Sequence, residues 1–238
     1  MDPSSRIIVA LDYPDLARAL AVAATLAPRV AMFKVGLELF NAAGPAAIDE
    51  IRALGADVFY DCKFYDIPNT VAGAAAAVGR LGVRMFNVHA LGGQAMMAAA
   101  KDAATRSAAE AGFPSPLVIA VTIVTSLSDH QLQHEIGMAE ASAQAVPRLA
   151  LLAKAAGLDG AVASVHEVPE IKRVCGRDFI AVTPGIRPAW AERGDHSRAA
   201  TPRAAVDAGA DYLVIGRPIT RADDPGKALE RIVAEMAE

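Results

Sequence analysis

The stretch LGADVFYDCK, residues 54–63, runs from the end of a predicted helix into a predicted strand. Gly55 stops the helix, because glycine adopts the left-handed conformation that follows a helix end at no steric cost. Asp57 then stands in the connection, and the apolar run after it has the length of a buried strand. The same order of helix end, glycine and strand recurs at residues 81–84 (LGVR), 156–159 (AGLD) and 208–211 (AGAD). These junctions indicate a repeating βα unit.

Eight apolar runs of strand length recur along the chain, and Ala-rich helical segments separate them. The runs are continuous rather than alternating, as expected of parallel strands that are buried on both faces. The predicted strands are residues 7–12, 31–36, 57–63, 84–90, 117–124, 160–164, 179–184 and 212–216. The clearest predicted helices are residues 15–27, 45–54, 70–81, 94–111, 202–208 and 225–236, with N-caps or first-turn prolines expected at Asn69, Thr201-Pro202 and Asp224-Pro225.

This alternation predicts an α/β fold, a (β/α)8 TIM barrel that forms a single domain over residues 1–238. An open doubly wound sheet is the alternative. It is less favoured because the first strand is followed by DYPD at 12–15 and not by a G-x-G-x-x-G turn. Two long loops, residues 125–137 and 185–200, follow the fifth and seventh strands, and loops of this length are usually functional.

The composition excludes several classes of protein. The chain of 238 residues has 23 Lys and Arg against 27 Asp and Glu, and a net charge of −4 argues against binding a nucleic-acid polymer. Apolar residues make up 53% of the chain, which excludes a disordered protein. Two cysteines cannot form a disulfide framework or a four-cysteine zinc site. No signal peptide or membrane span is recognisable, so we expect a soluble, cytoplasmic protein.

Charged residues stand at the carboxyl ends of the first three predicted strands. They are Asp12, Lys34, Asp61 and Lys63. In a barrel of this kind these ends meet at the face that carries the active site. Strand alternation puts Asp61 and Lys63 on one face and points Cys62 away, so Cys62 is expected to be a small buried residue and not a nucleophile. A purely structural ion-pair network is the alternative, but four charges exceed what such a network needs.

A second group of residues predicts a phosphate site. Gly216 and Arg217 follow the last strand, and Arg187 can reach the same end from the loop after the seventh strand. Glycine lets a backbone N–H approach a phosphate, and arginine binds it with a two-pronged fork. The histidines are less informative: His130 and His134 have helical metal-ligand spacing but are expected on a solvated, loop-like segment, while His166 is either a site residue or a strand-end cap.

One segment carries a resemblance to a known family. Residues 61–70, DCKFYDIPNT, resemble the D-x-K-x-x-D-I-P-x-T signature of the orotidine 5′-phosphate decarboxylase family. Further matching segments follow the family's order from residue 7 to the C-terminus: ALD at 10–12, FKVG at 33–36, NVHA at 87–90, VTPGIR at 182–187 and VIGRPIT at 214–220.

The resemblance implies a homodimeric barrel that converts orotidine 5′-monophosphate into UMP and CO₂, the last step of de novo pyrimidine nucleotide synthesis, without cofactor or metal. Lys63 would protonate C6 of the pyrimidine, Asp61 would face the substrate carboxylate, and Lys34 and Asp12 would complete the charge array and contact the ribose. The remaining implied roles are partner-site contacts for Asp66, Ile67 and Thr70, base contacts for Thr125 and Pro184, and phosphate contacts for Arg187, Gly216 and Arg217.

One departure and one electrostatic expectation accompany this assignment. The family usually has a glutamine in the loop after the seventh strand, where residues 195–198 here read DHSR and place His196. A histidine can still donate a hydrogen bond to a phosphate. Asp61 and Asp66 flank Lys63 in the sequence, and nearby carboxylates favour the charged form of a lysine.

Two rival functions stay open. A magnesium-dependent sugar-phosphate decarboxylase or hexulose-phosphate synthase shares the D-x-K-x-x-D pattern, but such enzymes hold the metal partly through an acidic residue at the end of the second strand. Here that strand offers Lys34, a cation that repels Mg²⁺. A barrel that only binds a phosphorylated metabolite is the second rival, although phosphate binding alone needs no buried carboxylate beside a lysine.

Overall fold

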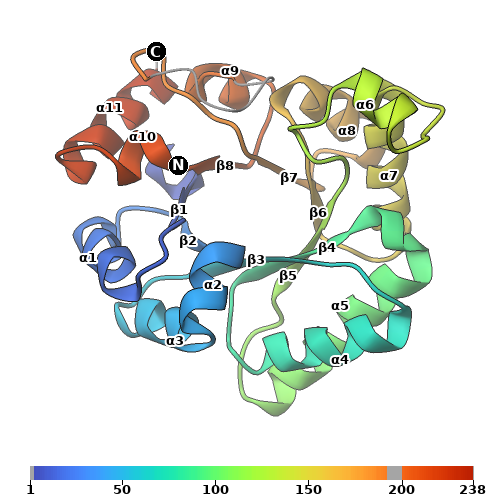
Figure 1. Ribbon diagram of the computed structural model, residues 1–238, viewed down its shortest axis with the longest axis horizontal. Coiled ribbons are helices and arrows are strands. Elements are labelled where there is room, and N and C mark those ends of the chain that lie inside the picture. Colours follow the sequence, from blue (N-terminus) through green and yellow to red (C-terminus); the bar gives the residue numbers. More distant parts are fainter. Residues whose placement is uncertain (1–2, 192–199, 238) are drawn as a thin grey trace.

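The computed structural model describes residues 3–191 and 200–237, which form a closed barrel of eight parallel strands. The strands follow one another around the barrel in sequence order, and β8 pairs with β1 through Val214 and Ile8, which closes the ring (Figure 1). Their bounds are β1 Ile7–Ala10, β2 Met32–Val35, β3 Val58–Phe64, β4 Met85–His89, β5 Leu117–Val121, β6 Gly160–Val162, β7 Ile180–Thr183 and β8 Tyr212–Ile215. The predicted (β/α)8 barrel is confirmed.

Helices surround the barrel and cover the outer face of the sheet (Figure 1). The glycines of the four predicted junctions all have positive φ, between 64° at Gly82 and 91° at Gly209, as a helix-stopping glycine requires. The helices are α1 Leu16–Leu26, α2 Leu37–Ala43, α3 Ala46–Ala53, α4 Pro68–Gly79, α5 Gly93–Glu110, α6 Asp129–His134, α7 Ser142–Ala155, α8 Val168–Cys175, α9 Pro202–Asp207, α10 Arg217–Thr220 and α11 Pro225–Ala237, with short 3-10 turns at Pro3–Arg6, Ala90–Gly92 and Val165–Glu167.

Two apolar layers hold the fold together. The larger lies between the strands and the helices and includes buried side chains such as Phe33, Phe86 and Ile48. The smaller is the second buried cluster, to which alternate residues of the strands contribute: Ile8, Ala10, Met32, Phe59, Met85, Ile119, Val182 and Val214. Burial of this kind stabilises by roughly 25 cal/mol for each Å² of apolar surface removed from water.

Several boundaries differ from the sequence prediction. Asp12 and Gly36 follow β1 and β2 instead of ending them, since these strands end at Ala10 and Val35. Asn69 does not cap α4: the helix begins earlier, with Ile67 as its N-cap and a proline in the first turn. The caps expected at Thr201 and Asp224 are confirmed, since their side chains accept hydrogen bonds from Ala204 N and Lys227 N.

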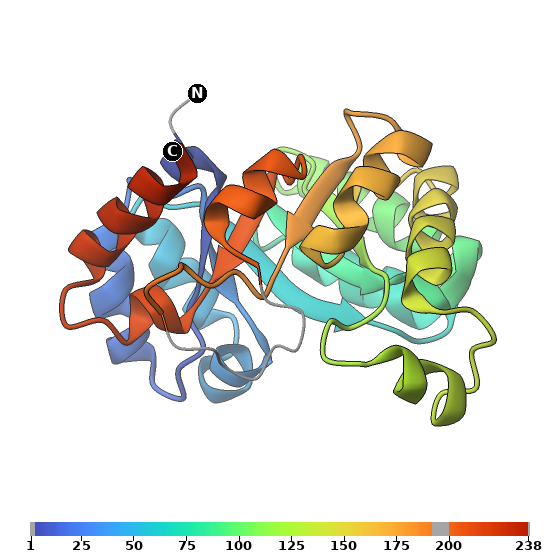
Figure 2. The same ribbon diagram turned by 90° about the horizontal axis from the view of Figure 1, so that it is seen from above.

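The structure also contains helices that the sequence analysis did not single out, namely α2, α6, α7, α8 and α10. The expectation that His130 and His134 lie on a loop-like segment was wrong, because both residues lie on the helix α6. Ser128 and Gln131 form a capping box that starts α6 there. Figure 2 shows α2 and α6 on the same side of the barrel, where the strands' carboxyl ends point. Among the described residues, no helix combines the length and apolar character needed to span a membrane.

Candidate active site

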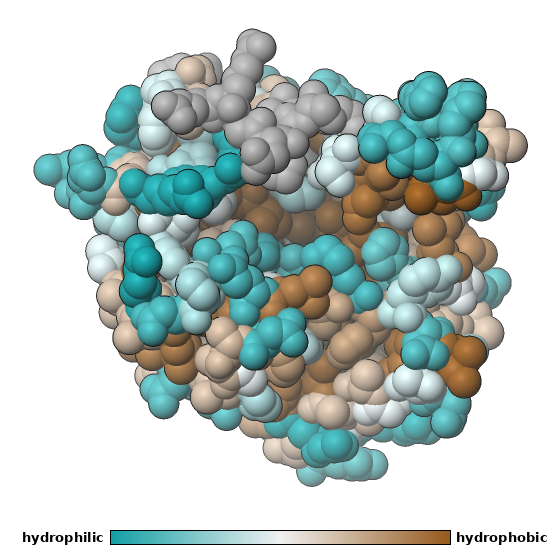
Figure 3. All heavy atoms as spheres, viewed as in Figure 1, coloured by the Kyte–Doolittle hydropathy of each residue, from teal (hydrophilic) through white to brown (hydrophobic). Residues whose placement is uncertain are grey.

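A cavity of about 1090 Å³ opens at the carboxyl ends of the strands. Figure 3 views this face and shows it hollowed over the barrel axis, with apolar residues in its depth and hydrophilic residues around it. The cavity is lined by residues from six of the strand ends that the sequence analysis singled out. These are Asp12, Lys34, Asp61, Lys63, Thr125, Pro184, Arg187, Gly216 and Arg217. A single concave site therefore collects both the charge array and the expected phosphate-binding residues.

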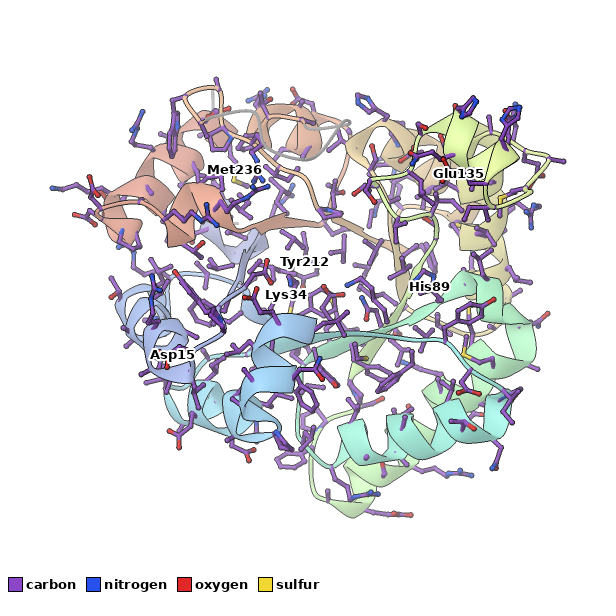
Figure 4. All side chains as sticks on the ribbon, viewed as in Figure 1. Asp15, Lys34, His89, Glu135, Tyr212 and Met236 are labelled. Atoms are coloured by element: carbon purple, nitrogen blue, oxygen red, sulfur yellow. The ribbon has the colours of Figure 1, made fainter. Side chains whose placement is uncertain are left out.

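Four charged side chains alternate in sign across the cavity floor. Lys34 Nζ lies 2.9 Å from Asp12 Oδ1 and 3.3 Å from Asp61 Oδ2. The other oxygen of Asp61 accepts a hydrogen bond from Lys63 Nζ at 2.6 Å. Figure 4 shows Lys34 in the middle of the ring of strands, whereas Asp15 lies at its periphery. The predicted convergence of Asp12, Lys34, Asp61 and Lys63 is confirmed, and Asp61 is the member shared by both lysines.

Gly36 makes room for this array. A Cβ atom at Gly36 would stand 2.7 Å from Lys34 Nζ and 3.3 Å from Asp12 Oδ1. The distance to Lys34 Nζ is shorter than real Cβ contacts. Any larger residue would therefore push the ammonium group of Lys34 away from its two carboxylates. The motif FKVG contained this glycine, but its role depends on the folded position of the lysine and could not be inferred from spacing.

The array shifts the pKa values of its buried members. Burial alone would lower the pKa of Lys34, but the carboxylates of Asp61 and Asp12 outweigh it, and the pKa ends above its ordinary value of 10.5. Burial would likewise raise the pKa of Asp61. Lys34, Lys63 and a hydrogen bond from Asn87 reverse that effect and hold the pKa below 3.8. Both groups are therefore charged at neutral pH.

Replacing Asp61 by asparagine is expected to lower the free energy of unfolding at neutral pH. The free energy of unfolding of the variant should also fall less than that of the parent when the pH is lowered. The folded pKa of Asp61 is lowered, so the ionised group stabilises the fold above its ordinary value of 3.8, and this contribution disappears as the pH falls through the folded pKa. The loss at pH 7 should be about 3 kcal/mol, the low end for breaking a buried ion pair, because Lys34 keeps Asp12. Urea unfolding at pH 7 and at pH 3 measures both effects; equal losses at the two pH values would contradict the assignment.

Two neighbouring side chains lie outside the cavity lining. Cys62 points away from Lys63, donates to the backbone carbonyl of Asn87 at 3.2 Å and is buried, and burial raises the pKa of its thiol to about 12. It is therefore protonated, as expected of a buried structural cysteine. His89 lies at the end of β4, and burial together with the charge of Lys63 lowers its pKa, which favours the neutral imidazole.

The expected phosphate-binding residues belong to the same cavity. Arg187, Gly216 and Arg217 all line it. The backbone N–H of Arg187 donates to Ala200 O at 2.8 Å, which joins the two ends of the loop after β7 and fixes where Arg187 leaves the barrel. His196 lies outside the described residues, so its expected phosphate contact stays a prediction.

Asp66, Ile67 and Thr70 do not line the cavity of their own chain. All three are exposed, and Ile67 is 66% exposed. Asp66 Oδ1 accepts a hydrogen bond from Ile67 N at 2.6 Å. Among the described residues, Asp61 is the one carboxylate within 4.0 Å of Lys63 Nζ. Asp66 therefore does not pair with Lys63 within a single chain, and its expected contact with the partner's site stays a prediction.

Several cavity residues were not identified from the sequence. They follow strand ends or lie on α1, on α2 or at the end of α10, and they line the same cavity: Tyr13, Arg18, Glu38, Ser126 and Arg221. The positions of Tyr13, Glu38 and Ser126 carried a usable signal, since loops that follow barrel strands build the active face. Of the uncertain histidines, His166 is exposed, and His130 and His134 stack their rings at 4.4 Å on the exposed side of α6. None of the three lines the cavity.

The closed parallel barrel, with an alternating Asp/Lys array at the carboxyl ends of its strands, defines the class: a (β/α)8-barrel protein with an enzyme-like polar centre. The model of the orotidine 5′-phosphate decarboxylase / HUMPS family matches residues 5–232. The chain belongs to this family.

Individual relatives agree with this assignment. The chain is 53% identical over 236 residues to orotidine 5′-phosphate decarboxylase from Moorella thermoacetica, covering 99% of this chain and 94% of the relative. It is 51% identical to orotidine 5′-phosphate decarboxylase from Syntrophotalea carbinolica, and the match covers 100% of this chain and 97% of the relative. Among solved structures, orotidine 5′-phosphate decarboxylase from Lactobacillus acidophilus superposes with a TM-score of 0.83 at 39% identity, covering 98% of this chain and 99% of that one.

Proposed function

We propose that this protein decarboxylates orotidine 5′-monophosphate to UMP and CO₂, the last step of de novo pyrimidine nucleotide synthesis, without cofactor or metal. The observation that carries the proposal is the Asp12–Lys34–Asp61–Lys63 array in one cavity with Arg187 and Arg217. Full-length relatives that bear the name of this activity support it.

The chemistry requires a proton donor beside a site of developing negative charge. Cleavage of the bond between C6 and the carboxylate releases CO₂ and leaves the electron pair on C6. Lys63 Nζ then donates a proton to C6, becomes a neutral amine and regains a proton from solvent. The ammonium group also stabilises the carbanion electrostatically before the proton moves. Asp61, 2.6 Å from Lys63 Nζ, holds this ammonium in place and faces the substrate carboxylate.

The remaining residues bind and orient the substrate. Arg187, Gly216 and Arg217 hold the phosphate, Thr125 and Pro184 contact the base, and Asp12 and Lys34 contact the ribose hydroxyls. Arginine suits phosphate binding because two N–H groups of its guanidinium can donate hydrogen bonds to two phosphate oxygens at once. Phosphate contacts far from C6 supply binding energy that orients the reacting carbon over Lys63.

The proposal includes a homodimer in which Asp66, Ile67 and Thr70 reach the partner's site. In support of it, these residues are exposed beside Tyr65, whose side chain is 61% exposed. Exposed large apolar side chains such as those of Tyr65 and Ile67 are typical of an interface. A cytoplasmic location also stays a prediction from the sequence.

The direct test is to add orotidine 5′-monophosphate to the purified protein and follow the ultraviolet absorbance of the pyrimidine. We expect complete conversion to UMP, with CO₂ released in equal amount. UMP titration in parallel measures binding without turnover. Binding of both nucleotides with no absorbance change would contradict the proposal and favour a protein that only binds phosphorylated metabolites.

A magnesium-dependent sugar-phosphate decarboxylase or hexulose-phosphate synthase is the alternative within the same broad family. In this chain the ammonium group of Lys34 stands between the carboxylates of Asp12 and Asp61, the place where a cation would bind. Incubation with EDTA is therefore expected to leave kcat unchanged. A parallel magnesium-dependent enzyme under the same treatment shows that the chelator is effective. Loss of activity with EDTA and recovery with Mg²⁺ would favour the alternative.

A further inference from the structure

The two reacting-centre residues Asp61 and Lys63 lie on an irregular part of β3. Tyr60 pairs with Phe86 of β4 and Phe64 pairs with Val88, so β3 advances four residues while β4 advances two. Three residues of β3 therefore face one residue of β4, as in an extended β-bulge. Bulges interrupt the ladder of backbone hydrogen bonds, and the groups that lose their partners need others when they are buried.

The residue opposite the bulge is Asn87, whose side chain is 1% exposed. Its Oδ1 accepts a hydrogen bond from Lys63 N at 2.7 Å, and its Nδ2 donates to Asp61 Oδ1 at 2.7 Å. Its backbone carbonyl accepts from Cys62 Sγ at 3.2 Å. One residue thus satisfies a group on each of the three bulged residues. Asn87 is not among the residues that line the cavity.

Lys63 needs this support because its backbone is strained. Its φ is +50°, the one positive φ of a residue other than glycine in the described ranges. Left-handed backbone costs roughly 1 kcal/mol or more for such a residue and persists only where the surroundings enforce it. At this strained position Lys63 N donates its hydrogen bond to Asn87 Oδ1, and the side chain extends to Asp61.

We infer that Asn87 is a positioning residue for the reaction: it holds Lys63 in its left-handed conformation and holds Asp61 Oδ1 in place for the ammonium group. The inference rests on the proposed function for its consequence in catalysis. Asn87 does not touch the substrate cavity, so its loss should affect the alignment of the proton donor and not the affinity for nucleotide.

The test compares Asn87→Ala with a matched control, Val88→Ala. Val88 is the next residue of β4, is 0% exposed and takes no part in the hydrogen bonds around Lys63. We expect Asn87→Ala to lower kcat by roughly 10²-fold while KM and the Kd of UMP change by less than about threefold, because misplacing a reacting group by about 1 Å has that effect. Val88→Ala should lose stability but keep kcat.

A conservative variant and a second readout complete the design. Asn87→Thr keeps a hydroxyl that can donate and accept, so its kcat should lie between those of Asn87→Ala and the parent; it also carries the test if Asn87→Ala does not fold. Hydrogen exchange of the Lys63 amide should accelerate by about 10-fold or more in Asn87→Ala relative to the other β3 amides, and not in Val88→Ala.

Parental kcat in folded Asn87→Ala, or unchanged exchange of the Lys63 amide, would overturn the inference. So would a loss of UMP binding in proportion to the loss of kcat, since that indicates general damage to the site. A parent chain that binds UMP but releases no CO₂ would instead overturn the proposed function, while the exchange measurement would still judge the role of Asn87.

Discussion

Replacing Lys63 by alanine is expected to lower kcat by roughly 10⁴-fold or more while UMP still binds, since one group supplies both the proton and the electrostatic stabilisation of the carbanion. The ammonium group of Lys63 pairs with Asp61 Oδ1 at a distance of 2.6 Å, and Lys63 lines the cavity. Lys34 cannot substitute for it, because Lys34 Nζ is already held between Asp12 and Asp61. The arginines Arg187 and Arg217 remain, so phosphate binding should survive. Turnover and UMP titration on the same preparation measure the two effects.

The matched control is Lys101→Ala. Lys101 also pairs with an aspartate at 2.6 Å, in this case Asp159, but neither residue lines the cavity. The Lys101→Ala substitution removes the same charge and the same kind of ion pair as Lys63→Ala. The kcat of this control should stay within about twofold of the parent, as expected for a substitution away from the site. Substantial turnover by Lys63→Ala would show that another group protonates C6.

Much of the fold was predictable because its signals are local. The helix-stopping glycines, such as Gly55 and Gly209, and the continuous apolar runs each act within a few residues, and together they specify eight βα units. Boundaries were less predictable. The capping box of Ser128 and Gln131 was also local and was readable from the sequence, but the polar character of the segment suggested a loop.

The candidate site divides in the same way. Asp12, Lys34, Asp61 and Lys63 were predictable because the carboxyl ends of parallel strands meet at one face, whatever the details of packing. The role of Asn87 was not predictable, because it depends on the register between β3 and β4, which pairs residues about 25 positions apart in sequence. The roles of Gly36 and of the exposed Asp66 likewise depend on where side chains reach in three dimensions.

Mixing two inactive variants, Asp66→Ala and Lys63→Ala, is expected to restore activity if Asp66 completes the partner's site. Asp66 is exposed, and among the carboxylates of residues 3–191 and 200–237 only that of Asp61 pairs with Lys63 within a chain, so Asp66 is available to a second copy. In a mixed two-fold dimer, one site contains both substitutions and the other contains neither. Random association of equal amounts then gives about a quarter of the parental number of intact sites, and the same fraction of the parental activity.

The control mixture is Lys63→Ala with Asp61→Ala. These two residues are in direct contact within one chain, at 2.6 Å, so every site of a mixed dimer lacks one of them and no activity should return. Recovery in the first mixture and none in the second can arise only if Asp66 acts across the interface, because both mixtures contain the same Lys63 variant. Absence of recovery in verified mixed dimers would place Asp66 in its own subunit's site. It would then require the segment after β3 to move inward from the exposed position that the isolated chain gives it.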